Sequence, residues 1–210
     1  TLYVASSYDH RNLSIAVLSP RELSQFNYPD KFKAISNKSE QFLYGFAHNG
    51  FAYFLYTQVN FDQGHQETRL GRVCEDDPQY SSYHEVPLQC QDSKVATTAS
   101  VSTWLPDNSK QTDGAYLYVA FEQTGHRNSS IICSFKLETL EKFYQESVTN
   151  CNTLAHHTLL LRKFYGQRQS CEKIEQKAHM CGKNGINRWI DEQNQFQGKP
   201  VFKLVNGQWK

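Results

Sequence analysis

Hydrophobic residues occur in short runs separated by polar turns, which is the pattern of β-strands. Residues 51–59 are apolar or aromatic at nearly every position rather than at alternate positions. We therefore expect this strand to be covered on both faces of its sheet. The aromatic-rich residues 42–48 come before it, and Asn49-Gly50 between the two runs is a strong hairpin signal.

The strand signals fall into groups of about 40 to 50 residues, which is the period of a β-propeller. Doubly covered strands fit this architecture, because propeller blades pack face to face; a β-sandwich would show alternation instead. The predicted strands of the first group are residues 42–48, 51–59, 68–74 and 83–89, and those of the second are 95–104, 115–121 and 130–135. Residues 2–5 and 201–205 are also predicted strands.

Helix is expected to be minor. Leu137, Leu140, Phe143, Tyr144 and Val148 have the spacing of a short amphipathic helix after the strand that holds Cys133. Residues 19–22 carry a helix-start signal of N-cap serine, proline and glutamate. Residues 151–191 are polar, irregular and contain cysteines, so we expect an excursion from the propeller rather than a blade strand.

Composition excludes several classes of protein. The 210 residues include 22 basic and 21 acidic side chains, a net charge of +1, which is not the footprint of a general nucleic-acid binder. Mean hydropathy is −0.66, and no apolar run approaches the roughly 20 residues of a membrane span. Aromatic residues make up 13% of the chain, ample material for one folded domain.

The cysteines and glycosylation sequons indicate the compartment. There are six cysteines, none in a CxxC pair or at zinc-finger spacing from histidines, so no metal site is expected. N-x-S sequons at Asn12, Asn37 and Asn128 lie in polar, turn-like sequence. Together they favour a secreted or extracellular glycoprotein over a cytosolic protein with free buried thiols.

The two ends of the chain lie inside strand signals. Residues 2–5 read as a strand already in progress, and Asn206-Gly207 is a hairpin turn followed by three residues. We expect residues 1–210 to be a fragment of a single domain within a longer protein.

Several motifs together resemble the plexin-type sema domain, over nearly the whole chain. The resemblance is most specific in the cysteine series and the Asp-Asp-Pro turn, and the growth-factor-receptor type of sema domain fits the cysteine spacing less well. The motifs are Leu2-Tyr3-Val4, Gly45-Phe46-Ala47, residues 51–58, Thr68-Arg69-Leu70-Gly71-Arg72-Val73-Cys74, Asp76-Asp77-Pro78, residues 82–90, Ile132-Cys133-Ser134-Phe135, Asn150-Cys151, Ser170-Cys171 and Met180-Cys181-Gly182.

The plexin pattern implies three disulfides, which pair Cys74 with Cys181, Cys90 with Cys133 and Cys151 with Cys171. Strand geometry bears on one alternative. Residues 82–89, extended at about 3.3 Å each, would separate Cys74 from Cys90 by about 26 Å. A disulfide needs Cα atoms about 5.5 Å apart, so these sequence neighbours should not bond.

No enzymatic or metal-binding motif emerges from the residues, and no cofactor is expected. Asp76-Asp77 before a proline are expected to serve turn geometry. His156-His157 lack a third metal ligand, and residues 182–185 lack the glycine and hydroxyl of a phosphate loop. Arg69 and Arg72, three residues apart on a strand, should face opposite sides, one at a blade edge and one in solvent. The candidate recognition loops are residues 61–66, 107–114 and 162–169.

The resemblance implies about four blades of a seven-bladed all-β propeller, built from four-stranded antiparallel blades with a disulfide-rich excursion. It also implies an extracellular segment of a single-pass receptor whose partner is the sema domain of a semaphorin, acting in cell guidance. The transmembrane segment would lie outside this sequence, and no nucleic acid or small-molecule substrate is expected. The alternatives are a semaphorin-like ligand, a growth-factor-receptor-type sema domain, and an extracellular glycan-processing enzyme using carboxylates such as Glu67 and Glu85.

Overall fold

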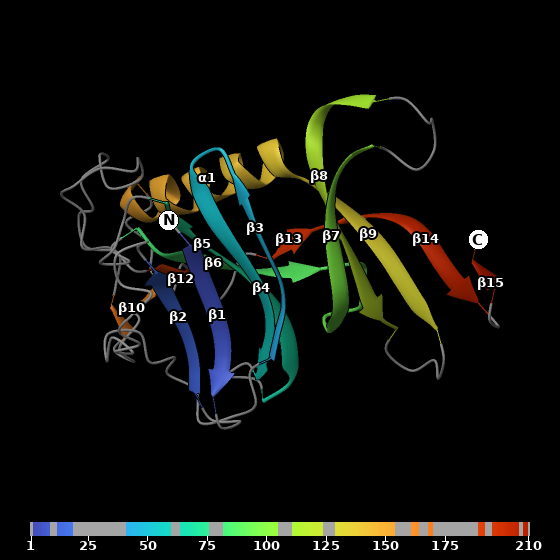
Figure 1. Ribbon diagram of the computed structural model, residues 1–210, viewed down its shortest axis with the longest axis horizontal. Helices are drawn as coiled ribbons and strands as arrows, with labels where there is room; N and C mark the ends of the chain where they lie inside the picture. Colours follow the sequence, from blue (N-terminus) through green and yellow to red (C-terminus); the bar gives the residue numbers. More distant parts are fainter. Residues whose placement is uncertain are drawn as a thin grey trace.

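The chain is nearly all β-structure, with one α-helix in the part of the chain that is described. The computed structural model describes residues 2–8, 12–18, 41–59, 64–75, 82–104, 111–123, 129–153, 161–163, 168–169, 189–191, 195–205 and 208–209. These residues form a two-stranded hairpin, an eight-stranded sheet and a five-stranded sheet (Figure 1).

The first sheet is built around an antiparallel meander of four strands. These are β3 (Gln41–His48), β4 (Phe51–Val59), β5 (Gln66–Cys74) and β6 (His84–Gln89), hydrogen-bonded in that order. Asn49 and Gly50 have φ angles of 48° and 77°, the left-handed values that a tight hairpin turn requires. The predicted hairpin and the predicted four-strand group are both confirmed.

Short strands from the excursion, and one strand that follows it, extend the free edge of β6. These are β10 (Leu161–Lys163), β11 (Arg168–Gln169), β12 (Trp189–Asp191) and β13 (Phe196–Gln197). Both β12 and β13 pair with β6 in parallel. The excursion therefore leaves the second sheet and returns along the edge of the first.

The second sheet repeats the same plan. Its strands are β7 (Ala96–Trp104), β8 (Gln111–Glu122), β9 (Ser130–Lys136), β14 (Lys199–Val205) and β15 (Gln208–Trp209), and each pairs with its neighbour in an antiparallel sense. β8 begins four residues before the predicted strand, within the predicted loop 107–114. Trp104 pairs with Gln111, so residues 111–114, which were expected in the loop, belong to strand β8.

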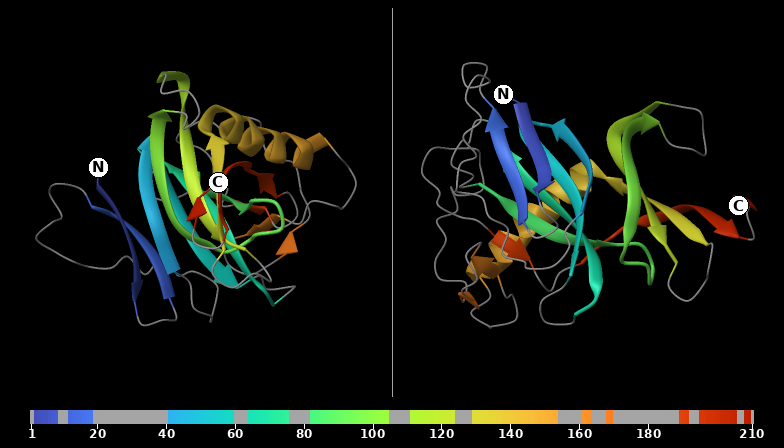
Figure 2. Two further views of the ribbon diagram at one scale, coloured as in Figure 1. Left: turned by 90° about the vertical axis from the view of Figure 1, so that its right-hand side faces the viewer. Right: turned by 60° about the horizontal axis from the view of Figure 1, so that its bottom comes forward.

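A hydrophobic core lies between the two sheets. Side chains with 0% exposure come from both of them, and α1 (Leu137–Thr153) adds Leu137, Leu140 and Tyr144 to the same cluster. Figure 2 shows α1 lying across the ends of the strands rather than in a separate layer. The helix predicted from the 137–148 spacing is confirmed, and it extends to Thr153.

The prediction that β4 is covered on both faces is also correct. Six consecutive residues, Ala52 to Thr57, are buried, although their side chains alternate between the two faces of the sheet. Leu55 and its neighbours on one face join the core between the sheets. Phe54 and Tyr56, on the other face, are 4% and 1% exposed.

The hairpin of β1 (Leu2–Tyr8) and β2 (Asn12–Leu18) lies beside β3, on the opposite side from the second sheet (Figures 1 and 2). β1 confirms the strand expected near the start of the chain, and β2 was not predicted. The helix start expected at residues 19–22 lies outside the described residues.

Candidate functional site

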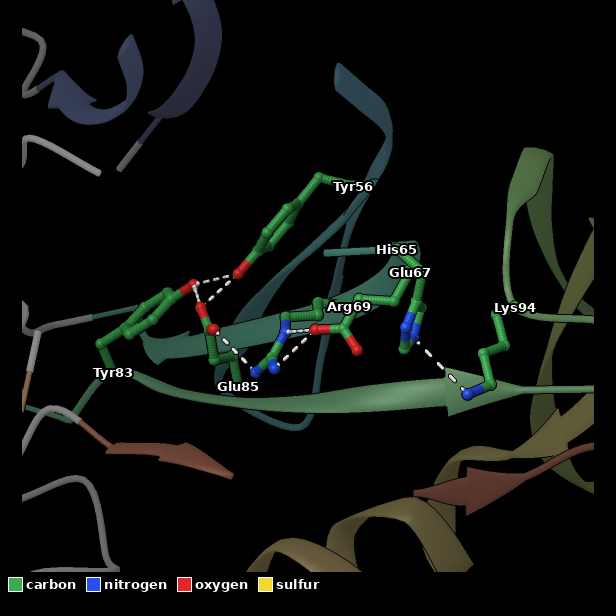
Figure 3. Close-up of polar contacts among 7 residues, drawn as sticks. All are labelled: Tyr56, His65, Glu67, Arg69, Tyr83, Glu85 and Lys94. Carbon is green, nitrogen blue, oxygen red and sulfur yellow. Dashed lines mark hydrogen bonds and ion pairs between the residues drawn. The ribbon is translucent and has the colours of Figure 1, made fainter. Parts of the chain in front are cut away.

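The face of the first sheet that points away from the second sheet buries a group of charged and phenolic side chains (Figure 3). Its centre is Arg69 on β5, which is 2% exposed. The Nε and a terminal nitrogen of Arg69 each lie 2.7 Å from Oε1 of Glu67, and another terminal nitrogen lies 3.1 Å from Oε1 of Glu85. We call Tyr56, Glu67, Arg69, Tyr83 and Glu85 the buried polar cluster.

Two tyrosine hydroxyls form hydrogen bonds with the other carboxylate oxygen of Glu85. The hydroxyl of Tyr83 donates to Glu85 Oε2 at 2.7 Å, and the hydroxyl of Tyr56 donates to the same oxygen. The two hydroxyl oxygens lie 3.1 Å apart. Buried charges are tolerated when they are paired and hydrogen-bonded in this way.

Electrostatics in the cluster follow from burial and from the two carboxylates. Burial raises the pKa of Tyr56 and of Tyr83 well above the usual value, and the negative charge of Glu85 raises both further. Burial alone would lower the pKa of Arg69, but the carboxylates of Glu85 and Glu67 outweigh it and raise that pKa. The guanidinium is therefore charged and both hydroxyls are neutral at any physiological pH.

Close packing fixes the ring of Tyr83 over β5. A Cβ built on Gly71 would lie 2.5 Å from the hydroxyl oxygen of Tyr83 and 3.0 Å from two of its ring carbons. Only glycine leaves room for the ring at this point. The ring crosses the strand to bring its hydroxyl to Glu85.

On the opposite face of β5, Arg72 holds the helix against the sheet. Its guanidinium carbon lies 4.3 Å from the ring centroid of Phe51 and 4.2 Å from that of Tyr144, within the range of cation–π attraction. The hydroxyl of Tyr144 donates to the backbone carbonyl of Leu70. Burial raises the pKa of Tyr144 well above its usual value, so this hydroxyl stays protonated as a donor.

Glu141 of the same helix reaches the β3–β4 turn. Its carboxylate accepts a hydrogen bond from Asn49 at 3.1 Å and lies 3.5 Å from Nε2 of His48. The helix is thus anchored to the turn as well as to β5. This end of the first sheet is a single packed unit of turn, strand and helix.

A disulfide joins the two sheets covalently. Cys90, which follows β6, is bonded to Cys133 on β9, with Cα atoms 6.0 Å apart. Both residues have 0% exposure and belong to the core cluster. This is one of the three pairs that the family resemblance implies, and it excludes a Cys74–Cys90 bond.

The far face of the second sheet is far less covered than the far face of the first. Tyr116, Tyr118 and Ala120 on β8 are partly exposed, and their neighbour Ile132 on β9 is partly exposed as well. Phe202 on β14 pairs with Ile132 and is 38% exposed. Among the described residues, no other large hydrophobic side chain is as exposed. This sheet therefore presents an apolar, aromatic surface.

Comparison with known proteins connects these features to one family. No protein-family model matches the chain. The chain is 30% identical to Plexin-B2 of Mus musculus over an aligned length of 148, and the match covers 66% of this chain. It is 24% identical to Plexin-A2 of Homo sapiens over an aligned length of 197, and that match covers 82% of the chain. It spans 8% and 10% of the lengths of these two relatives.

Solved structures agree at the level of the fold. The full extracellular region of Plexin A4 superposes with a TM-score of 0.68 at 18% identity, covering 96% of this chain and 28% of that one. The chain belongs to the plexin-type sema family. Drosophila Plexin A, solved in complex with Semaphorin 1b, superposes with a TM-score of 0.56 at 11% identity, covering 97% of this chain and 43% of that one.

Of the remaining predicted site residues, some lie within the described part of the chain and others lie outside it. Cys74 is disulfide-bonded, and Cys151 lies in α1, while Cys171 and Cys181 lie outside the described residues. The pairs Cys74–Cys181 and Cys151–Cys171 therefore stay predictions. Asn12 is the first residue of β2 and pairs with Tyr8.

Other candidates fall beyond the described part of the chain. These are Asn37, Asn128, Asp76-Asp77, His156-His157 and residues 182–185. Each candidate recognition loop is described in part: residues 64–66 of the first, 111–114 of the second, and the strands β10 and β11 of the third. Among the described residues, no group of three metal-binding side chains occurs.

The prediction for the two arginines is half correct. Arg69 and Arg72 do face opposite sides of β5. Neither is in solvent, since they are 2% and 4% exposed, and neither is at an edge, because β5 lies between β4 and β6. Of the two rings that cover Arg72, Phe51 comes from the start of β4, and Tyr144 comes from a helix far along the sequence. A strand pattern alone does not reveal the helix that covers Arg72.

Proposed function

We propose that this chain is an extracellular, ligand-binding segment of a plexin-like cell-surface receptor that recognises semaphorins and signals in cell guidance. The observation that carries the proposal is the 30% identity to Plexin-B2, joined to the structural likeness to the Plexin A4 extracellular region. Drosophila Plexin A has been solved in complex with Semaphorin 1b. A protein of the same class is the proposed partner here.

The proposed scaffold is part of a seven-bladed β-propeller, with about four blades in this chain and the rest elsewhere in the receptor. Two observations support it. The sheets β3–β4–β5–β6 and β7–β8–β9–β14 have the same strand order, and they share one core. The exposed aromatic face of the second sheet fits a surface that receives the next blade.

Recognition by such a segment is a matter of protein–protein contact on a rigid support. The helix anchors at Arg72 and Glu141 and the Cys90–Cys133 disulfide fix the two sheets against each other. Loops carried on a rigid β-scaffold are well suited to bind another protein. The candidate contacts remain the loops at residues 61–66, 107–114 and 162–169.

A disulfide-stabilised plexin-type domain fits the extracellular face of the plasma membrane. The helix α1, at 17 residues, falls short of a membrane span in length and apolar content, and the described part of the chain holds no other candidate. We propose that the receptor is anchored by a transmembrane segment outside this sequence. Glycans at Asn12, Asn37 and Asn128 are part of the same proposal.

A glycan-processing enzyme is the alternative from a different class. Glycosidases need one carboxylic acid and one carboxylate open to the substrate. Glu67 and Glu85 are 3% exposed each and are both ion-paired with Arg69, which supports a structural role for them. Turnover of a panel of aryl glycosides by the purified ectodomain would favour the enzyme over the receptor.

The direct test is binding of the full ectodomain to a panel of semaphorin ectodomains by surface plasmon resonance. We expect saturable binding to at least one member. Three further ectodomains, each with one candidate loop replaced by a Gly-Ser segment of equal length, locate the contact. Thermal melting of each variant provides the folding control. A folded ectodomain that binds no semaphorin would overturn the proposal.

A further inference from the structure

A short segment of chain crosses directly over the Cys90–Cys133 disulfide. Residues 196 and 197 pair with Leu88 and Gln89, just before Cys90 on the first sheet. Residues 199 and 200 pair with Ser134 and with Cys133 itself on the second sheet. Residues 196–200 therefore bridge the two sheets at the place where the disulfide bridges them.

Gly198 is the point of closest approach. A Cβ built there would lie 2.8 Å from the Cβ of Cys133 and 2.5 Å from Cζ of Phe135. Real Cβ atoms do not approach other heavy atoms so closely, because van der Waals repulsion rises steeply below about 3.5 Å, and a densely packed interior leaves the neighbours little room to move away. The backbone of residue 198 thus lies against the disulfide with no space between them.

The crossing segment is anchored on both sides of Gly198. The backbone N–H of Gly198 donates to the carbonyl of Gln89 at 2.8 Å. The ring of Phe196 packs against Phe135 and Phe143, with centroid distances of 6.0 Å and 5.0 Å. The hydroxyl of Ser134 also donates to the backbone carbonyl of Lys199 at 3.4 Å. Strand pairing, these two hydrogen bonds and two aromatic contacts hold the segment in place.

The segment also forms the outer surface at this point. Gln197, Lys199 and Pro200 are exposed, whereas Cys90 and Cys133 have 0% exposure. A single layer of chain therefore separates the disulfide from solvent. The remaining sides of the disulfide are formed by the sheets and the core cluster.

From this geometry we infer that residues 196–200 act as a strap that withholds the Cys90–Cys133 disulfide from thiols. Reduction requires a thiolate to approach one sulfur and expel the other. With the strap in place neither sulfur is accessible. Under native conditions the disulfide is reduced when the strap moves away from it. The strap therefore controls how fast a thiol can break the covalent link between the two sheets. This inference does not depend on the identity of the ligand.

The test uses the intact ectodomain and dithiothreitol as the reductant. One dithiothreitol thiolate attacks Sγ of one cysteine, the other cysteine leaves as a thiolate and is protonated, and a mixed disulfide forms. The second dithiothreitol thiol then displaces the protein sulfur, which gives two protein thiols and cyclic oxidised dithiothreitol. Alkylation with N-ethylmaleimide at timed intervals and peptide mass spectrometry measure the thiols at Cys90 and Cys133.

Two variants loosen the strap in different ways. Gly198→Ala introduces the clash with Cys133 and Phe135, and Phe196→Ala removes the aromatic anchor without adding atoms. Gly114→Ala is the matched control, because its Cβ would meet just the end of the Lys136 side chain, at 3.4 Å. Circular dichroism checks the folding of each, and Phe196→Ala alone suffices if Gly198→Ala does not fold.

We expect reduction at Cys90 and Cys133 to be at least tenfold faster in the strap variants than in the wild type, and unchanged in Gly114→Ala. The reduction rate of the strap variants relative to the wild type should not change in low concentrations of urea, because opening of the strap exposes little surface. Equal rates in the wild type and in the folded strap variants would overturn the inference. So would rates that rise with urea as steeply as global unfolding does, since the thiols would then be reached by unfolding of the whole domain.

Discussion

At the scale of single residues, the stability of the first sheet depends on charges that are buried with their partners. Arg69 has two carboxylate partners on one face of β5, and Arg72 has two aromatic rings on the other. The prediction from strand alternation, that the two arginines lie on opposite faces, is correct. It gave no information on their burial, because the covering groups come from β4, β6 and α1, distant in sequence.

Removing the buried charge at Arg69 should be costly. Arg69→Met leaves Glu67 and Glu85 buried without their shared cation, and we expect a loss of about 3–5 kcal/mol in the free energy of unfolding. Lys142→Met is the matched control, because Lys142 pairs with Glu138 while 65% exposed, and ion pairs exposed to solvent contribute little to stability. Urea denaturation of the ectodomain measures both. Equal losses would contradict the role assigned to Arg69.

Because tyrosines are buried in this domain, we expect its free energy of unfolding to depend on pH in the alkaline range. Burial raises the pKa of Tyr53 from 10.0 to about 12, although the positive charge of Arg72 opposes the shift. A tyrosine with a raised folded-state pKa contributes stability that is complete below pH 10, its unfolded value, and lost as pH rises toward 12. Unfolding free energy measured at fixed urea should therefore fall between pH 10 and pH 12.

Removing the hydroxyl of Tyr53 tests this pH prediction. Tyr53→Phe should reduce the alkaline loss of stability, because the variant carries no ionisable group at this position. Absorbance at 295 nm follows the ionisation of the phenols directly. If all tyrosines of the folded protein ionised together near pH 10, the described burial would be wrong.

At the scale of elements, the sequence predicted strands best where apolar residues were continuous. The predicted bounds of β4 and its turn agree with the structure, because an unbroken run of six apolar or aromatic residues directly after Asn49-Gly50 admits few alternatives. β12 and β13 have three and two residues and lie in polar sequence. They are strands because the edge of β6 is available to pair with them, and no local pattern encodes that edge.

The hydroxyl of Tyr144 is expected to hold α1 to the first sheet. Tyr144→Phe keeps the ring beside Arg72 but removes the donor to the Leu70 carbonyl, which then lies buried without this hydrogen bond. The expected cost is about 1–3 kcal/mol. Hydrogen exchange should show faster exchange in α1 relative to β8, and Tyr116→Phe should not produce that difference. Unchanged exchange in α1 would argue against this contact as an anchor.

At the scale of the whole molecule, the Cys90–Cys133 disulfide and the excursion tie the two sheets into one unit. The disulfide closes 43 residues of chain, and the chain-entropy relation gives a stabilisation of roughly 4 kcal/mol. Cys90→Ala combined with Cys133→Ala should lower the melting temperature of the ectodomain measurably. Calorimetry of the double variant against the wild type measures the change. A melting temperature equal to that of the wild type would show that packing alone joins the sheets.

The apolar face of the second sheet bears on how the segment behaves outside its receptor. Tyr118, Ile132 and Phe202 would contact water if residues 1–210 were isolated. We expect the isolated segment to aggregate, since large exposed apolar faces promote association. Size-exclusion chromatography with light scattering checks this. A monodisperse 24.3 kDa monomer with cooperative melting would contradict it.

The two described sheets are proposed to be successive blades of a radial array in a plexin-like ectodomain. Cryo-electron microscopy of the intact ectodomain tests this claim most directly. We expect a further antiparallel sheet packed on the far face of β7–β8–β9–β14, with Tyr118 buried beneath it. A map in which that face lies open to solvent, or is covered by helices, would contradict the claim.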